Sequence, residues 1–207
     1  MKENEYKYML KKGESDYIQS CLKLNGTGLA VRHKSQTNYY YDTEDYTLDK
    51  AGITCRVRDD GCVLEGTLKI HGRSEREGNV EIPLKTEGVP ESFMLGERRL
   101  IFLGSLHTDR IIYEISEGVR LMFDTNTYLG ERDYEMEIEF EESKRREAGN
   151  LLRETELFAY QYRVMCGGES SADKNGAVLS KSGRFIRKKQ GMKGSENKVN
   201  IIINFGF

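Results

Sequence analysis

Apolar and polar side chains alternate along several short stretches of the chain, a pattern typical of β-strands with one buried face. The stretch Ile53–Arg58 (ITCRVR) alternates cleanly, since apolar residues occupy one face and Thr54, Arg56 and Arg58 the other. A turn-forming Asp-Asp-Gly run then leads into Cys62–Ile70, which predicts a hairpin. Further strands are predicted at Glu3–Leu10, Gln36–Asp42, Asn79–Leu84, Thr108–Ile115, Val119–Asp124 and Tyr134–Phe140.

Other segments carry apolar residues at helical spacing. This spacing predicts a helix over Glu142–Tyr162 and a shorter helix that Ser15 can cap. Pro90–Leu106 is also predicted to be helical, with a proline near its start and a glycine near its end. Ala177–Lys189 is expected to form a basic helix, and Val199–Phe205 is expected to be an apolar run of β type. Strands with helices at intervals predict an α+β fold.

Charges of one sign repeat on single strand faces. The repeats are Glu3 and Glu5, Arg56 and Arg58, and Glu135, Glu137 and Glu139. One explanation is an antiparallel sheet whose charged face lies in water. However, like charges at this spacing repel one another, so a solvated face has no need to collect them. About eight strands are enough to close a small barrel with the charges inside. Such an interior would suit a polyphosphate together with Mg²⁺ or Mn²⁺.

The composition narrows the classes of partner and of metal. The chain of 207 residues fits one domain, and its 32 basic and 34 acidic residues give no bulk attraction to nucleic acid or to anionic membranes. The four cysteines show no C-x-x-C spacing and the three histidines are scattered, so any metal should be a hard one held by carboxylates. No apolar run is long enough to cross a bilayer, and no signal peptide is evident. We therefore expect a cytoplasmic protein with reduced thiols.

A set of motifs follows one another along residues 3–165. They are ENEYK, NYYYDT, ITCRVR, GTLKI, VEIP, the lone Arg110, RLMFDTNTYLG and YEMEIEFE, with an extension to SKSGR at Ser180. In this order they resemble the CYTH family, the triphosphate tunnel metalloenzymes. The resemblance implies an eight-stranded antiparallel β-barrel, the triphosphate tunnel, with helices packed outside. It also implies a tunnel domain over residues 1–190 and a C-terminal tail over residues 191–207.

The resemblance assigns roles to single residues by motif. The metal ligands would be Glu3, Glu5, Asp124 and two of the three glutamates Glu135, Glu137 and Glu139. The phosphate-binding residues would be Lys7, Arg56, Arg58, Lys69, Arg110 and Arg120, with Glu81 lining the tunnel. Glu5, Lys7, Arg56 and Arg58 are the residues expected to take part in catalysis. Lys181 and Arg184 either close the tunnel or lie on a solvated helix. Many family members have a lysine where this chain has Thr108, so the resemblance leaves one phosphate contact open.

Three functions are compatible with these residues. The first is hydrolysis of an inorganic or small organic triphosphate, such as tripolyphosphate, ATP or thiamine triphosphate, with Mg²⁺ or Mn²⁺ as cofactor. The second is a class IV-like adenylate cyclase, which would use the same tunnel to make cyclic AMP from ATP. The third is a protein that binds polyphosphate or nucleotide without turnover. Neither a nucleic-acid duplex nor a membrane is expected as a partner, and a homodimer is left open.

Overall fold

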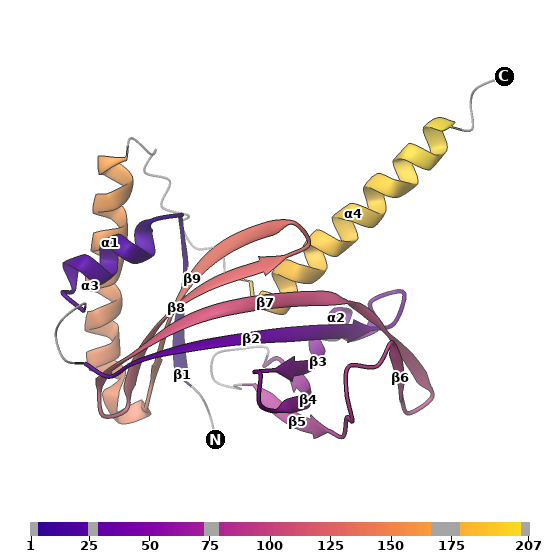
Figure 1. The fold of residues 1–207 in the computed structure, drawn as a ribbon, viewed down its shortest axis with the longest axis horizontal. Helices are drawn as coiled ribbons and strands as arrows, with labels where there is room; N and C mark the ends of the chain where they lie inside the picture. The colour runs from indigo at the N-terminus through magenta and orange to yellow at the C-terminus, as the bar shows by residue number, and fades with distance from the viewer. Residues whose placement is uncertain (1–3, 25–28, 73–78, 167–178, 204–207) are drawn as a thin grey trace. The chain divides into compact units, whose positions relative to one another are not determined.

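The computed structural model describes residues 4–24, 29–72, 79–166 and 179–203, with side chains described as far as Met192. Figure 1 shows the elements in chain order. The strands are β1 (Asn4–Leu10), β2 (Val31–Asp42), β3 (Ile53–Asp59), β4 (Leu64–Ile70), β5 (Val80–Leu84), β6 (Ser92–Leu95), β7 (Arg98–Ser116), β8 (Val119–Tyr128) and β9 (Glu131–Phe140). The helices are α1 (Glu14–Cys21), α2 (Thr47–Lys50), the 3₁₀ helix η1 (Glu142–Lys144), α3 (Arg145–Met165) and α4 (Lys181–Ile203). Among the described residues, no helix is both long and apolar enough to cross a membrane.

The strands form one antiparallel sheet. Its hydrogen-bonded order is β1-β9-β8-β7-β2-β3-β4-β5, and β6 pairs with β7 outside this path. The register is antiparallel in β1–β9, β2–β3, β3–β4, β4–β5, β6–β7 and β7–β8. The predicted antiparallel α+β class is therefore confirmed. The strand number differs, because the described part of the chain has nine strands rather than eight and its strand order has two ends, β1 and β5.

The sheet is divided between two compact units, and strands β2, β7 and β8 each have residues in both. Unit 1 comprises Met1–Gln36, His107–Thr127 and Glu131–Val178, and unit 2 comprises Thr37–Leu106, Tyr128–Gly130 and Leu179–Phe207. In unit 1, helices α1 and α3 pack on each other. Their apolar sides bury side chains such as Ile18 and Ala159 with Leu121 and Ile138 of the sheet.

Unit 2 contains two separate apolar clusters. One includes Tyr41, Cys55 and Val57, where the end of β2 pairs with the beginning of β3. The other surrounds Phe185 of α4, whose ring centroid lies 4.9 Å from that of Tyr40. Because the side chain of Phe185 is completely buried, this second cluster fixes the first turns of α4 to the strands of unit 2.

Two sequence-based predictions of secondary structure were wrong. Pro90–Leu106 forms strand β6, a turn and the first part of β7 instead of a helix. Its buried residues Leu100, Leu103 and Leu106 recur every three positions, which imitates helical spacing. Gly104 interrupts the regular alternation, since it adopts φ 141°, a conformation that favours glycine. At the C-terminus, the run predicted to be of β type is helical as far as Ile203, and residues 204–207 lie outside the described part.

Candidate functional site

Strands β1 and β9 bring acidic and basic residues onto one face of unit 1. Their register places Glu5 opposite Glu139 and Lys7 opposite Glu137. Alternate residues of a strand share a face, so Glu135 points to the same side as the other two glutamates of β9. The other face of these strands contributes Met136 and Ile138 and, from β1, Tyr6 and Tyr8 to the apolar core of the unit. The apolar alternation thus fixes which way the charges point.

Three of these carboxylates form a group that suits a metal ion. Glu5, Glu137 and Glu139 each offer an oxygen, and these oxygens lie within 4.8 Å of one another. Carboxylate oxygens are the ligands that Mg²⁺ and Mn²⁺ prefer, so the residues present fit a hard divalent cation. The geometry also distinguishes the three glutamates of β9, because Glu135 is not part of the group. Glu3, the other predicted ligand on this strand, lies outside the described residues.

Lys7 lies among the carboxylates rather than in solvent. Its Nζ is 3.2 Å from Oε1 of Glu137, 3.3 Å from Oε1 of Glu135 and 3.4 Å from Oε1 of Glu5. Burial alone would lower the pKa of Lys7, but the three carboxylates outweigh it and raise the pKa above its usual value. The ammonium group is therefore charged throughout the physiological pH range. Glu135, whose side chain is 0% exposed, has its charge balanced by this lysine.

Arg110 connects two further carboxylates. It makes two hydrogen bonds of 2.6 Å to Asp124, from Nε to Oδ1 and from Nη2 to Oδ2, and Nη2 also lies 2.5 Å from Oε2 of Glu137. Burial would lower the pKa of Arg110, but these anions raise it. Asp124 is buried and both of its carboxylate oxygens accept from Arg110, which places it against the arginine and outside the group of three. Arg120 forms an ion pair with Glu139, at 2.6 Å from Nη2 to Oε2.

A second charged cluster lies in unit 2, on strands β3, β4 and β5. The carboxylate of Glu81 lies 3.4 Å from Nη2 of Arg56 and 3.2 Å from Nζ of Lys69. Burial raises the pKa of Glu81, but the two cations outweigh it and hold the pKa below its usual value. The Nε atom of Arg56 is buried and has no hydrogen-bond partner among the described residues. A buried guanidinium N–H of this kind can donate a hydrogen bond to an anionic ligand.

The beginning of α4 extends this basic cluster. Ser180 accepts a hydrogen bond of 3.1 Å from the backbone of Gly183, and Ser182 contacts Thr54 of β3 at 2.9 Å. Tyr40 is buried beside four cations, which are Arg56, Arg58, Lys181 and Arg184. Burial raises the pKa of Tyr40, and these positive charges oppose that rise. Lys181 and Arg184 therefore share the electrostatic surroundings of the strand arginines.

The comparison with known protein families matches this arrangement. A family model described as the CYTH domain matches residues 1–165, which is more than half of the chain. The chain belongs to the CYTH family.

Individual CYTH relatives are more distant. The candidate triphosphatase YjbK of Bacillus subtilis is 28% identical over 156 residues, which cover 66% of this chain and 76% of YjbK. A candidate adenylate cyclase from Bacillus halodurans has a TM-score of 0.58 at 23% identity, covering 88% of this chain and 96% of that protein. The candidate adenylyl cyclase HpAC1 from Hippeastrum, described as having a dominant triphosphatase activity, has a TM-score of 0.54 at 18% identity, covering 83% and 92%. At these identities the solved structures show that the fold is shared.

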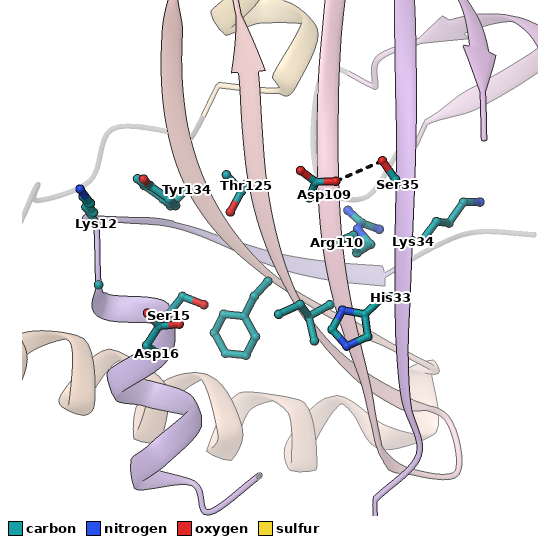
Figure 2. Close-up of a pocket in the computed structure, with 13 residues that line it drawn as sticks. Lys12, Ser15, Asp16, His33, Lys34, Ser35, Asp109, Arg110, Thr125 and Tyr134 are labelled. Atoms are coloured by element: carbon teal, nitrogen blue, oxygen red, sulfur yellow. Dashed lines mark hydrogen bonds between the residues drawn. The ribbon is translucent and has the colours of Figure 1, made fainter. Parts of the chain in front are cut away.

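The CYTH chain also has a cavity of about 610 Å³ on the opposite face of the unit 1 sheet. Figure 2 shows its lining residues beside the first turn of α1, with Ser35 hydrogen-bonded to Asp109 at 3.1 Å. Asp109 and Thr125 pair in the register next to Arg110 and Asp124, so their side chains point away from the acidic group. The lining of the cavity carries charges of both signs, with Lys12, Lys34 and Arg110 beside Asp16 and Asp109.

Sequence reasoning missed two sets of polar partners in this CYTH domain. Thr108 is completely buried and donates to Asn126 at 2.7 Å, and Asn126 donates to Asp133 at 2.9 Å. In unit 2, Nε of Arg58 donates to Asn38 at 3.1 Å. Both asparagines lie on the charged side of their strands: Asn126 is two residues from Asp124, and Asn38 pairs with Arg58 in the register. Strand alternation was therefore the signal that could have found them.

Proposed function

We propose that this CYTH protein hydrolyses triphosphates with the help of Mg²⁺ or Mn²⁺. The observation that carries the proposal is the group of three carboxylates beside Lys7 and Arg110, in a chain whose family is established by its first 165 residues. Support comes from YjbK, named as a candidate triphosphatase, and from HpAC1, for which triphosphatase activity is described as dominant.

The acidic residues divide into two roles in this proposal. Glu5, Glu137 and Glu139 hold the divalent cation, since their oxygens are the ones that lie close together. A bound divalent cation supplies positive charge to phosphate oxygens and activates water for attack on phosphorus. Glu135 and Asp124 instead keep Lys7 and Arg110 charged and in position, through contacts of 3.3 and 2.6 Å. Glu3, outside the described residues, stays a predicted ligand.

The basic residues neutralise the triphosphate. Arg56, Arg58 and Lys69 present donors from one strand pair. The Nε of Arg56, which is buried and has no hydrogen-bond partner among the described residues, would donate to a phosphate oxygen. Such cations stabilise the charge that develops on the equatorial and leaving oxygens during phosphoryl transfer. Glu81 pairs with Arg56 and Lys69 in the absence of substrate. Arg120, with 45% of its side chain exposed, is free to exchange Glu139 for a phosphate oxygen.

We assign the basic first turn of α4 to the same functional domain, over residues 1–190. Lys181 and Arg184 lie beside the buried Tyr40 together with the strand arginines, and Phe185 fixes the helix there. The functional segment would then extend beyond the 165 residues that the family model matches.

Product analysis tests the proposal. The protein is incubated with tripolyphosphate, ATP or thiamine triphosphate, each with Mg²⁺ or Mn²⁺, and the products are identified by phosphorus NMR. Orthophosphate is expected. Pyrophosphate together with cyclic AMP would show a cyclase instead, and binding of all three compounds without any product would show a non-catalytic protein.

A further inference from the structure

The acidic group of unit 1 is already occupied by cations from the protein itself. Lys7, Arg110 and Arg120 pair with the five carboxylates of this face, which are Glu5, Asp124, Glu135, Glu137 and Glu139. Lys7 is the cation that contacts two members of the metal-fitting group at once, Glu5 and Glu137, at 3.4 and 3.2 Å. Its remaining contact, at 3.3 Å, is to Glu135, which is not a member.

A divalent cation and the ammonium of Lys7 cannot both stay close to these oxygens. Metal–oxygen bonds to Mg²⁺ are about 2.1 Å long. A metal bound to the Glu137 oxygen, which lies 3.2 Å from Nζ of Lys7, would therefore lie no more than roughly 5.3 Å from the present ammonium position. Two positive charges at that distance repel each other strongly where water is scarce. The oxygens themselves also turn toward the metal and away from the lysine. One of the two cations must therefore give way.

We infer that Lys7 is a built-in counter-cation, which holds the metal-binding carboxylates together in the metal-free protein and is displaced from Glu5 and Glu137 when a divalent cation binds. The inference rests on the proposed function only in taking these carboxylates as the metal ligands. The long, flexible side chain of lysine allows the shift, and Glu135 remains as its partner. The displaced ammonium then becomes available to a phosphate oxygen. Metal and triphosphate consequently bind better together than either does alone.

Metal binding without triphosphate tests this exchange. Free Mn²⁺ is measured by electron paramagnetic resonance during titration of the full chain, as wild type, Lys7→Met and Lys12→Met. Lys7→Met is expected to bind Mn²⁺ at least about tenfold more tightly, because the competing charge is gone. Lys12→Met removes the same charge from the rim of the cavity on the opposite face, so its affinity should stay within about twofold of wild type. Equal or weaker binding by Lys7→Met would overturn the inference.

A second measurement uses the wild-type protein and so does not depend on the folding of a variant. Limited acetylation, read by mass spectrometry, compares Lys7 with the exposed Lys12 in the same sample. Addition of Mn²⁺ is expected to raise the ratio of Lys7 to Lys12 modification at least about threefold, because Lys7 loses two of its ion pairs. An unchanged or lower ratio at saturating Mn²⁺ would show that Lys7 stays in place.

The inference and the proposed function can fail separately. If Lys7→Met binds Mn²⁺ more tightly but the wild type turns over no triphosphate, the cation exchange stands and the hydrolase proposal falls. If the wild type hydrolyses triphosphate but neither Mn²⁺ affinity nor acetylation responds as stated, the exchange alone is refuted.

Discussion

Two conservative substitutions on strand β9 should differ in how much they weaken metal binding. Glu139→Gln removes a member of the group whose oxygens lie within 4.8 Å of one another, whereas Glu135→Gln changes a carboxylate outside that group. We therefore expect the first variant to lose most of the stability that a divalent cation confers. The second should keep at least half of it, since the charge of Glu135 is already balanced by Lys7 at 3.3 Å.

The size of the effect follows from ligand linkage. At a cation concentration of about 100 times Kd, binding adds about 2.7 kcal/mol to the free energy of unfolding. If loss of one carboxylate ligand weakens the site about 100-fold, the same cation concentration equals the raised Kd of the variant. The gain in the free energy of unfolding then falls to about 0.4 kcal/mol. The metal-free stability should change by less than about 1 kcal/mol in Glu139→Gln, because its partner Arg120 is half exposed.

Urea melts with Mn²⁺ and with EDTA measure both quantities for each variant. Glu117→Gln, at an exposed turn of unit 1, controls for the loss of one negative charge. If Glu135→Gln abolishes the metal effect while Glu139→Gln retains it, the assignment of ligands from the spacing of their oxygens is wrong. A metal effect that persists in both variants would mean that the cation binds elsewhere.

Other predictions concern turnover, unit 2 and the thiols. Turnover should vanish in excess EDTA, and activity that survives the chelator would contradict the metal-dependent proposal. Arg56→Ala and Arg58→Ala should each lower kcat/KM at least about tenfold, which corresponds to about 1.4 kcal/mol. Melts must show that both variants are folded, and near-full activity would mean that the arginines do not belong to the site. Phe185→Ala should destabilise unit 2 by about 3 kcal/mol or more in a denaturant melt, because the side chain is completely buried among aromatic rings; a change below about 1 kcal/mol would mean that α4 is not anchored there. Burial raises the pKa of Cys55 to about 12, so at pH 8 its protonated thiol should resist alkylation while the exposed Cys62 reacts, and equal rates would contradict this.

The alternating strands could be predicted because a strand face is a property of the sequence itself. Ile53–Arg58 lies within β3, and Tyr134–Phe140 lies within β9, as their alternation indicated. The same alternation assigns the charged residues of each strand to one shared face. What it could not give is which residue on one strand faces which on another, since pairing between distant strands is set by the packing of the whole sheet.

The choice among the three glutamates of β9 depended on that missing register. All three point to the same side of the sheet, so their sequence spacing treats them alike. The antiparallel pairing sets Glu139 opposite Glu5 and Glu137 opposite Lys7, which leaves Glu135 further along the strand, opposite Met9. The pairing between β1 and β9 therefore decides which glutamates fit a metal and which one is the buried partner of Lys7.

The mistaken helix over Pro90–Leu106 has a related cause. Periodicity reports which side chains are buried, and a strand with an irregular backbone can bury every third residue. Gly104 makes this possible because a Cβ atom at its position would come within 2.9 Å of Cζ of Phe185. The glycine is thus needed for the close approach of α4, a helix whose first residue lies more than seventy positions later in the chain. No local pattern contains that information.

The two charged clusters are each built within one unit, and this makes their contributions separable by experiment. The acidic group is positioned by the register of β1 with β9 and by Arg110 of β7, all within unit 1. The basic cluster is positioned by the pairs β3–β4 and β4–β5 of unit 2, with Lys69 opposite Glu81. A substitution such as Arg56→Ala should therefore weaken triphosphate binding and leave the affinity for Mn²⁺ alone unchanged. Conversely, a change among the carboxylates should act on triphosphate through the metal and through their cationic partners Lys7, Arg110 and Arg120, so adding metal in large excess should recover part of the lost activity.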